Sequence, residues 1–191
     1  MDDIVKAALL KWPNVPHCTG WLALDGRGDW YMRDDRTQAA GPFPQSKGSC
    51  IRHDRLRSFI ERNYEADADG CWFFQNGPQR VYVELEAAPW ILGVQRLDSG
   101  WVLQTHCGNP FGPVGAAWLD DRGRLFLAGR QGLGLVRSAD MDCAADAVLA
   151  GLWQPQDCGF EELPQRYGYR LSPQSRQRDG VSSQRLATGT P

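Results

Sequence analysis

The stretch between Asp69 and Leu92 constrains the fold of this chain more than any other, because it predicts two strands joined by a tight turn. Three aromatic residues at 72–74 suit a pleated surface, and an Asn-Gly-Pro sequence at 76–78 supplies the turn. Apolar and polar side chains then alternate, with Val81, Val83 and Leu85 on one face and Tyr82, Glu84 and Glu86 on the other. One face of the second strand is therefore expected to lie on a core and the other to face water.

The length and composition are those of a packed globular protein. The chain has 191 residues, of which 42% are hydrophobic and eight are tryptophan, so one sizeable core or two small subdomains can form. The net charge of −2 arises from interleaved charges of both signs. This balance argues against binding to nucleic acid or to an anionic membrane surface.

Two features predict a cytoplasmic location. No apolar run approaches the roughly 20 residues that cross a bilayer, and the N-terminus is acidic where a secretory signal would be basic. The six cysteines are scattered and form no dense framework, so no disulfide is expected in a reducing compartment. They are Cys18, Cys50, Cys71, Cys107, Cys143 and Cys158.

Hydrophobic spacing and turn residues predict the other elements. Helices are expected at 2–11, 53–63 and 142–152. Hairpins are expected at 20–33, 90–106 and 116–128, with a further strand within 129–137. Residues 34–49 are rich in Asp, Arg, Gly, Pro and Ser, and this composition favours an exposed loop.

These elements predict an α+β fold, in which antiparallel meandering sheets form two halves with two or three short helices. An N-terminal α+β half is expected over 1–97 and a β-rich C-terminal half over 98–170. Residues 171–191 contain almost nothing apolar to bury, so a disordered tail is expected there.

An acid and a glycine recur before strands, at Asp25-Gly26, at Asp69-Gly70 and at Asp121-Arg122-Gly123. Turns of this type feed strands in most antiparallel sheets, which is one explanation. The other explanation is a duplication that relates the two halves.

Several of these segments together resemble a known bacterial family. The segments are Lys11-Trp12-Pro13, the hairpin with Asp25-Gly26 and Trp30-Tyr31, the helix from His53 to Tyr64, Asp69-Gly70 before the aromatic strand, and the strand closed by Ala87-Ala88-Pro89-Trp90. Over residues 11–137 the chain resembles the uncharacterised family called domain of unknown function 1285. The resemblance implies an α+β fold of two related sheet-containing halves and a role in signalling or ligand sensing. It implies no catalytic residues.

Histidine and cysteine neighbours make a zinc site one hypothesis, because imidazole and thiolate are zinc ligands. His17 with Cys18, and His106 with Cys107, would form a tetrahedral site if the two pairs converged. The spacing matches no zinc finger or ribbon, so buried thiols and surface imidazoles without a metal are the alternative. A Cys–His catalytic pair, with Cys107 or Cys18 as the nucleophile, is a further hypothesis. No nucleophile elbow or oxyanion signature accompanies it.

Arginines and tryptophans supply the candidate ligand-binding residues. Guanidinium groups bind carboxylate and phosphate through paired hydrogen bonds, and several arginines lie in or before the central hairpin. A mixed-charge surface, in which these arginines pair with neighbouring acids, is the alternative. The residues expected to bind a small anion are Arg33, Arg52, Arg55, Arg80, Trp72 and Trp90.

The predicted function is a non-catalytic ligand-binding or regulatory module for a small anionic ligand or a protein partner. A zinc-binding protein or a Cys/His-dependent enzyme is the alternative. No cofactor is expected apart from zinc under that alternative, and neither nucleic acid nor a membrane is an expected partner. The acidic pairs at Glu84 and Glu86, and at Glu161 and Glu162, are expected to be solvated rather than to exchange protons with a substrate.

Overall fold

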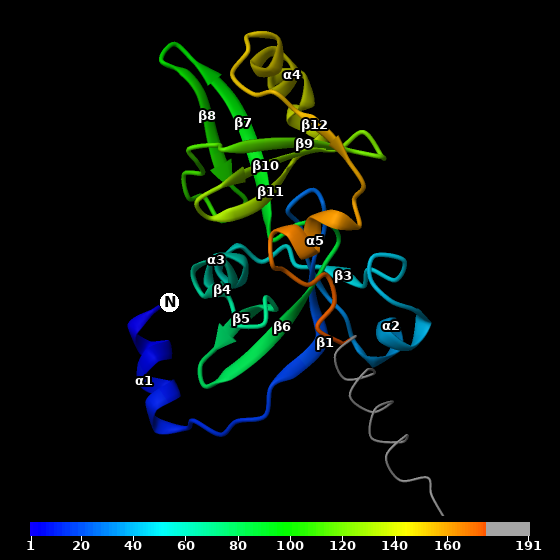
Figure 1. The fold of residues 1–191 in the computed structure, drawn as a ribbon. Helices are drawn as coiled ribbons and strands as arrows, with labels where there is room; N and C mark the ends of the chain where they lie inside the picture. The colour runs from blue at the N-terminus through cyan, green and yellow to red at the C-terminus, as the bar shows by residue number, and fades with distance from the viewer. Residues whose placement is uncertain (175–191) are drawn as a thin grey trace, which may run out of the picture.

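The computed structural model describes residues 1–174, which form two six-stranded β-sheets and five α-helices. Figure 1 shows the sheets as two halves, with the first sheet in the lower half of the view and the second in the upper half. The α+β class and the arrangement in two halves that the sequence predicts are confirmed.

The first sheet contains strands β1 (Cys18–Leu24), β2 (Trp30–Met32), β3 (Ser49–Cys50), β4 (Tyr64–Ala66), β5 (Trp72–Asn76) and β6 (Gln79–Leu85). Their order in the sheet is β3-β2-β1-β6-β5-β4. Two antiparallel three-stranded units meet at the parallel pair of β1 and β6, where Leu22 lies beside Val83 and Leu24 beside Leu85. The sheet is therefore mixed, whereas the sequence predicts antiparallel meanders.

The second sheet contains strands β7 (Trp90–Leu97), β8 (Gly100–Thr105), β9 (Ala116–Asp120), β10 (Leu125–Gly129), β11 (Gly132–Val136) and β12 (Gln156–Cys158). Their order is β12-β9-β10-β11-β7-β8. The antiparallel unit of β9, β10 and β11 joins the β7–β8 hairpin through a parallel pair of β11 and β7. Parallel pairs join strands that are distant in the chain, so local alternation of side chains cannot reveal them.

The helices are α1 (Asp3–Lys11), α2 (Asp35–Ala40), α3 (Asp54–Arg62), α4 (Met141–Leu149) and α5 (Glu162–Arg166), with a 3-10 turn η1 (Ser138–Asp140). The three predicted helices correspond to α1, α3 and α4 and are confirmed. The loop predicted at 34–49 is wrong where α2 lies, because Asp34 caps that helix by accepting a hydrogen bond from the backbone of Thr37 (2.8 Å). No helix among residues 1–174 is both long and apolar enough to span a bilayer.

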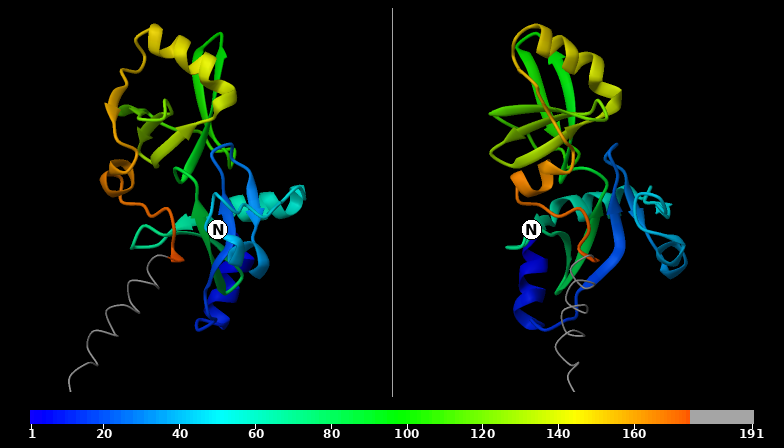
Figure 2. Two further views of the ribbon diagram at one scale, coloured as in Figure 1. Left: turned by 90° about the vertical axis from the view of Figure 1, so that its right-hand side faces the viewer. Right: turned by 45° about the vertical axis from the view of Figure 1, so that its right-hand side comes forward.

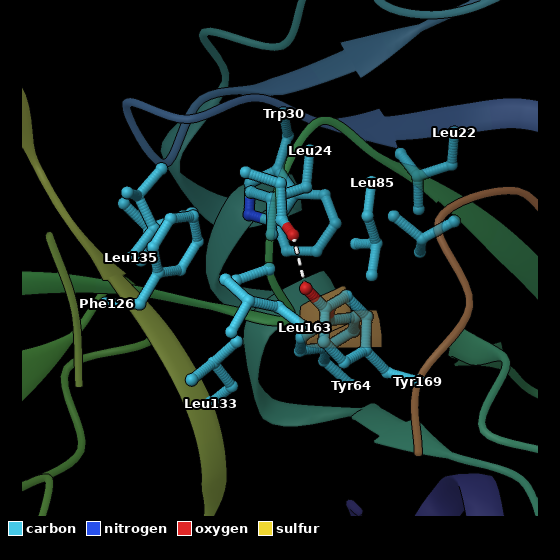
Figure 3. Close-up of a cluster of buried hydrophobic side chains, with 14 of the residues drawn as sticks. Leu22, Leu24, Trp30, Tyr64, Leu85, Phe126, Leu133, Leu135, Leu163 and Tyr169 are labelled. Carbon is cyan, nitrogen blue, oxygen red and sulfur yellow. Dashed lines mark hydrogen bonds between the residues drawn. The ribbon is translucent and has the colours of Figure 1, made fainter. Parts of the chain in front are cut away.

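The larger hydrophobic core lies between the two sheets. Figure 3 shows its centre, where Trp30 and Leu24 of the first sheet and Phe126 and Leu135 of the second belong to one buried cluster. Trp30 and Phe126 are both completely buried. The two halves therefore share a core, and each completes the burial of the other.

A second core lies within the second half, where α4 packs on the sheet. Ala144 and Ala147 of the helix are fully buried against a cluster that includes Leu92, Leu127 and Val136. Figure 2 shows α4 on the side of the second sheet away from the first half. Small residues on α4 let its backbone approach the strands closely.

The segment from 159 to 174 returns from the second half to the first, as Figure 2 shows. Leu163 of α5 is fully buried in the shared core, and the Tyr169 hydroxyl donates to the carbonyl of Ala87 (2.7 Å). The N–H of Leu85 donates to the carbonyl of Leu171 (2.8 Å). This segment therefore ties the halves together a second time.

The change of sheet falls between Leu85 and Trp90, whereas the sequence predicts a division after residue 97. The segment from 159 to 174 packs on the first half again. A single cut in the chain therefore does not separate the two halves. Of the predicted disordered tail at 171–191, residues 175–191 lie outside the described residues.

One turn geometry occurs four times in the described part of the chain, beginning at Asp25, Asp67, Thr105 and Asp120. In each, the side-chain oxygen of the first residue accepts from the N–H four positions later. The glycine at the fourth position has a φ between 72° and 90°, a conformation that favours glycine. The turn requires a glycine three positions after the aspartates at 25, 67 and 120, so it does not use the adjacent Asp25-Gly26 and Asp69-Gly70 pairs as such. The duplication of the halves stays a hypothesis.

Glu84 is buried, with 4% of its surface exposed, so the prediction that it faces water is wrong. The segment ending at residue 174 covers this face of β6. The guanidinium of Arg33, each of whose nitrogens donates to a backbone carbonyl, lies within electrostatic reach. Burial raises the pKa of Glu84, while Ser172 and Arg33 favour the charged form. The alternation along β6 could not reveal a cover from a segment about 90 residues away.

Changing Gly134 to Ala should destabilise the contact between β11 and β7. An added Cβ would lie 2.6 Å from Cγ of Leu92, which is fully buried. We expect a loss of about 1–3 kcal/mol in the free energy of unfolding, measured by chemical denaturation. Gly115→Ala is the control, because its nearest new neighbour is 4.0 Å away. Equal stabilities of the two variants would contradict the packing described here.

Changing Glu84 to Gln should flatten the dependence of stability on pH. A carboxyl group whose pKa is raised by folding stabilises the protein at low pH, and this contribution is lost as the pH rises through the raised value. The melting temperature of the wild type should therefore fall relative to that of Glu84→Gln as the pH rises above about 4.5. Glu161→Gln removes an exposed carboxylate as the control for net charge. A constant difference across pH would refute the prediction.

Candidate functional site

A cleft of about 560 Å³ opens where the two halves meet, at the edge of the shared core. Sites for small molecules commonly have volumes of roughly 300–1,000 Å³. The first half contributes the β1–β2 turn, β2, Lys47 and Glu86. The second half contributes the β9–β10 turn, β11, η1 and the start of α4. The lining residues are Asp25, Gly26, Arg27, Tyr31, Lys47, Glu86, Arg122, Gly123, Arg124, Leu135, Val136, Ser138 and Met141.

Two of the four recurring turns lie at this cleft, one from each half. They begin at Asp25 and at Asp120, and both have the sequence Asp-x-Arg-Gly. The buried carboxylate of Asp25 accepts from the N–H of Arg27 (2.9 Å), and that of Asp120 accepts from the N–H of Arg122 (3.0 Å). The same turn therefore presents an exposed arginine from each half.

A charged cluster forms the wall on the side of the first half. The Lys47 ammonium lies 2.9 Å from Oδ2 of Asp25 and 3.3 Å from Oε2 of Glu86. Tyr31 donates its hydroxyl to Asp25 (3.2 Å), and the N–H of Gly26 donates to Glu86 (3.2 Å). These contacts hold four side chains from separate parts of the chain in one arrangement.

The contacts within the cluster favour the charged forms of Asp25 and Lys47. Burial alone would raise the pKa of Asp25, but the hydrogen bonds from Lys47 and from two backbone N–H groups outweigh it, and the pKa is lowered. Burial alone would lower the pKa of Lys47, but Asp25 and Glu86 outweigh it, and the pKa is raised. Asp25 and Lys47 therefore form a fixed ion pair rather than a proton donor and acceptor.

The guanidinium groups of Arg27 and Arg122 have no carboxylate within ion-pair distance among the described residues. Arg122 lies with its guanidinium carbon 5.2 Å from the ring centre of Phe160. Arg124 differs, because its guanidinium is 2.7 Å from the carboxylate of Asp120. Arg27 and Arg122 therefore line the cleft without an ion-pair partner among the described residues.

The arginines predicted from the sequence lie elsewhere. Arg33 is 1% exposed and donates to the carbonyls of Gly20, Gly41 and Ser46, so it holds the β2 end and the α2 loop together. Arg80 lies over the ring of Phe73 (4.5 Å). Arg52 and Arg55 are exposed at the start of α3. The structure does not bring these four arginines together.

The two predicted tryptophans do lie together. The ring centres of Trp72 and Trp90 are 4.9 Å apart, and Tyr64 is 4.7 Å from Trp72. His106 lies 5.9 Å from Trp90 in the same aromatic cluster. Trp90 donates its indole N–H to the carbonyl of Gln131 (2.8 Å), so its polar edge is already used within the fold.

The two His/Cys pairs lie in different surroundings. His17 is exposed and contacts the edge of Tyr82, whereas His106 lies among the aromatic rings that include Trp30 and Tyr64. Among residues 1–174 no three His, Cys, Asp or Glu side chains are grouped so that they could hold a metal ion. The zinc hypothesis therefore gains no support from the geometry and stays a prediction.

His106 and Cys107 are close enough to interact, with 3.4 Å between Nε2 and Sγ. The N–H of Ile91 donates to Nδ1 of His106 (3.3 Å), which leaves Nε2 to carry the proton toward the sulfur. Burial lowers the pKa of His106 to about 3 and raises the pKa of Cys107 to about 12, with Arg57 and Glu61 as smaller causes. Both groups are neutral at pH 7, so the thiol is not activated as a nucleophile.

The cleft residues were absent from the sequence-based candidates. A usable signal exists, because Asp-x-Arg-Gly occurs at 25–28 and at 120–123, and both copies line the cleft. The sequence indicates the turns but not that an arginine in each faces the same space. Lys47 and Glu86 carry no local signal, since they meet only through tertiary packing.

Comparison with known proteins gives a family but no activity. Residues 1–174 match the model of the family described as "Protein of unknown function (DUF2946)". The chain is also similar to the crystal structure of a DUF1285 family protein from Silicibacter pomeroyi DSS-3, with 15% identity over 76% of this chain and 84% of that chain and a TM-score of 0.47. This is the family that the sequence resembles. No curated protein matches the chain.

Cys107 should resist alkylation in the folded protein. With a pKa of about 12, its thiolate fraction at pH 8 is roughly one in ten thousand. Iodoacetamide followed by mass spectrometry should label the exposed Cys50 first and Cys107 only after unfolding. Labelling of Cys107 in the native protein as fast as Cys50 would contradict the neutral pair and support the Cys/His enzyme hypothesis.

Proposed function

We propose that this chain, which belongs to the family described as protein of unknown function (DUF2946), is a non-catalytic module that binds a small organic anion in the cleft between its halves. The observation that carries the proposal is the pair of unpaired guanidinium groups, Arg27 and Arg122, presented to one cleft by two turns of the same sequence.

Charge supports an anion rather than a neutral ligand. An exposed guanidinium gains little free energy from a single ion pair in water. Two guanidinium groups that bind one carboxylate or phosphate can form paired hydrogen bonds with it. The third arginine, Arg124, is neutralised by Asp120, so it contributes less to the field in the cleft. Arg27 and Arg122 are thus the groups expected to contact the anion.

Shape and apolar surface support an organic ligand rather than a bare inorganic ion. The cleft of about 560 Å³ is far larger than a phosphate or sulfate needs. Leu135, Val136 and Met141 offer apolar contacts on the side of the second half. A carbon chain lying on these side chains would place its acidic group at the arginines.

The cysteines support the proposed cytoplasmic location. None of the six forms a disulfide, although all lie in the described residues. A chain that folds around its own core without cross-links suits a reducing compartment.

Binding of glutarate, a five-carbon dicarboxylate, tests the proposal by isothermal titration calorimetry at low ionic strength. The double change Arg27→Gln and Arg122→Gln should weaken binding about tenfold or more, because charge-assisted hydrogen bonds contribute about 1.5–3 kcal/mol each. Binding to the wild type should also weaken as sodium chloride is added, because both arginines are exposed.

Arg52→Gln with Arg55→Gln is the matched control, since it removes two exposed arginines outside the cleft. That variant should bind glutarate like the wild type. Loss of binding in the control with retention in the cleft variant would refute the cleft and favour the arginines predicted from the sequence. Absence of binding to the wild type would count against an anion-binding function.

A further inference from the structure

The cleft is lined by acidic as well as basic side chains, and this goes beyond a simple anion site. On the side of the first half, Asp25 and Glu86 share one cation, Lys47. Lys47 lies within ion-pair distance of both the buried Asp25 (2.9 Å) and the partly exposed Glu86 (3.3 Å), so one ammonium serves two carboxylates.

Glu86 has an oxygen to offer a ligand. Its Oε2 accepts from Gly26 and from Lys47, whereas no hydrogen bond to Oε1 is found among the described residues. Its side chain is 29% exposed and lines the cleft. A carboxylate oxygen in this position accepts hydrogen bonds and attracts a positive charge.

The other charged side chains at or beside the cleft differ in their ion-pair partners. Arg27 and Arg122 are unpaired, and Arg124 is paired with Asp120. Asp121 is exposed and accepts from the N–H of Phe160 (3.0 Å), outside the set of cleft-lining residues. Two guanidinium groups without an ion-pair partner and the partly exposed carboxylate of Glu86 therefore line one cavity of about 560 Å³.

We propose that the ligand is a small zwitterion of the amino-acid class, whose acidic group binds Arg27 and Arg122 and whose ammonium group binds Oε1 of Glu86. This inference rests on the proposed function, since it keeps the same anion contacts. The ammonium supplies a donor to Oε1 of Glu86, and its positive charge complements the charge of that carboxylate. A ligand with an acidic group alone would leave Oε1 of Glu86 without a donor and bring a second negative charge near it.

L-Glutamate and glutarate form a matched pair of probes, because they differ only in the α-amino group. Calorimetry on the wild-type chain should give at least about tenfold tighter binding of L-glutamate, the effect of one charge-assisted contact. Glu86→Gln should reduce L-glutamate to the affinity of glutarate and leave glutarate binding equal or slightly stronger. The Gln side chain keeps an oxygen to accept from Gly26, and melting temperature checks that the variant folds.

The outcomes separate this inference from the proposed function. Equal affinity of the wild type for both probes, or tighter binding of glutarate, overturns the zwitterion and leaves the anion site standing. Binding of neither probe overturns both. A Glu86→Gln variant that weakens both probes equally shows that Glu86 only positions Lys47, and this also overturns the inference. The comparison of probes on the wild type does not depend on the behaviour of the variant.

Discussion

The apolar contact between the two sheets is the constraint on which the rest of the structure depends. Trp30 and Phe126 are buried completely in this contact, and the returning C-terminal segment closes it through Tyr169. Because the core fixes how the halves meet, it also fixes where their edges diverge. Leu135 belongs both to the core and to the wall of the cleft, so the cleft is a direct extension of the packing. Rigid packing of this kind can hold the β1–β2 and β9–β10 turns at a constant separation.

Burial separates structural charges from charges that can serve binding. Arg33 is nearly inaccessible and its guanidinium is used by three backbone carbonyls, which removes it from any ligand. Arg27 and Arg122 are exposed, and it is their backbone N–H groups, not their side chains, that the turns use. The turn therefore fixes the position of each arginine while leaving its guanidinium available. Exposure is tolerated because water solvates the charge until a ligand replaces it.

The sequence was informative where the signal was local. Three helices, four hairpins and the α+β class follow from periodicity and turn residues, as around Asn76 and Gly77. The parallel pairs, the burial of Glu84 and the meeting of Lys47 with Glu86 depend on residues far apart in the chain, so no window could show them. The density of arginines over residues 33–57 predicts a binding site there, but the number of arginines does not indicate which of them are hydrogen-bonded within the fold. The two Asp-x-Arg-Gly sequences were visible, but only the fold shows that they line one cleft.

The pKa shifts of four groups argue against a role for them in acid–base catalysis at neutral pH. A general acid or base works best when its pKa lies near the working pH, where it can give and regain a proton. In the cleft the pKa of Asp25 is lowered and that of Lys47 is raised, so both move away from neutrality. For His106 and Cys107 the pKa shifts favour the neutral forms instead, with pKa values of about 3 and about 12. Neither set can exchange protons readily at pH 7. Fixed charges of opposite sign around an open space are instead suited to orienting a charged ligand without changing it.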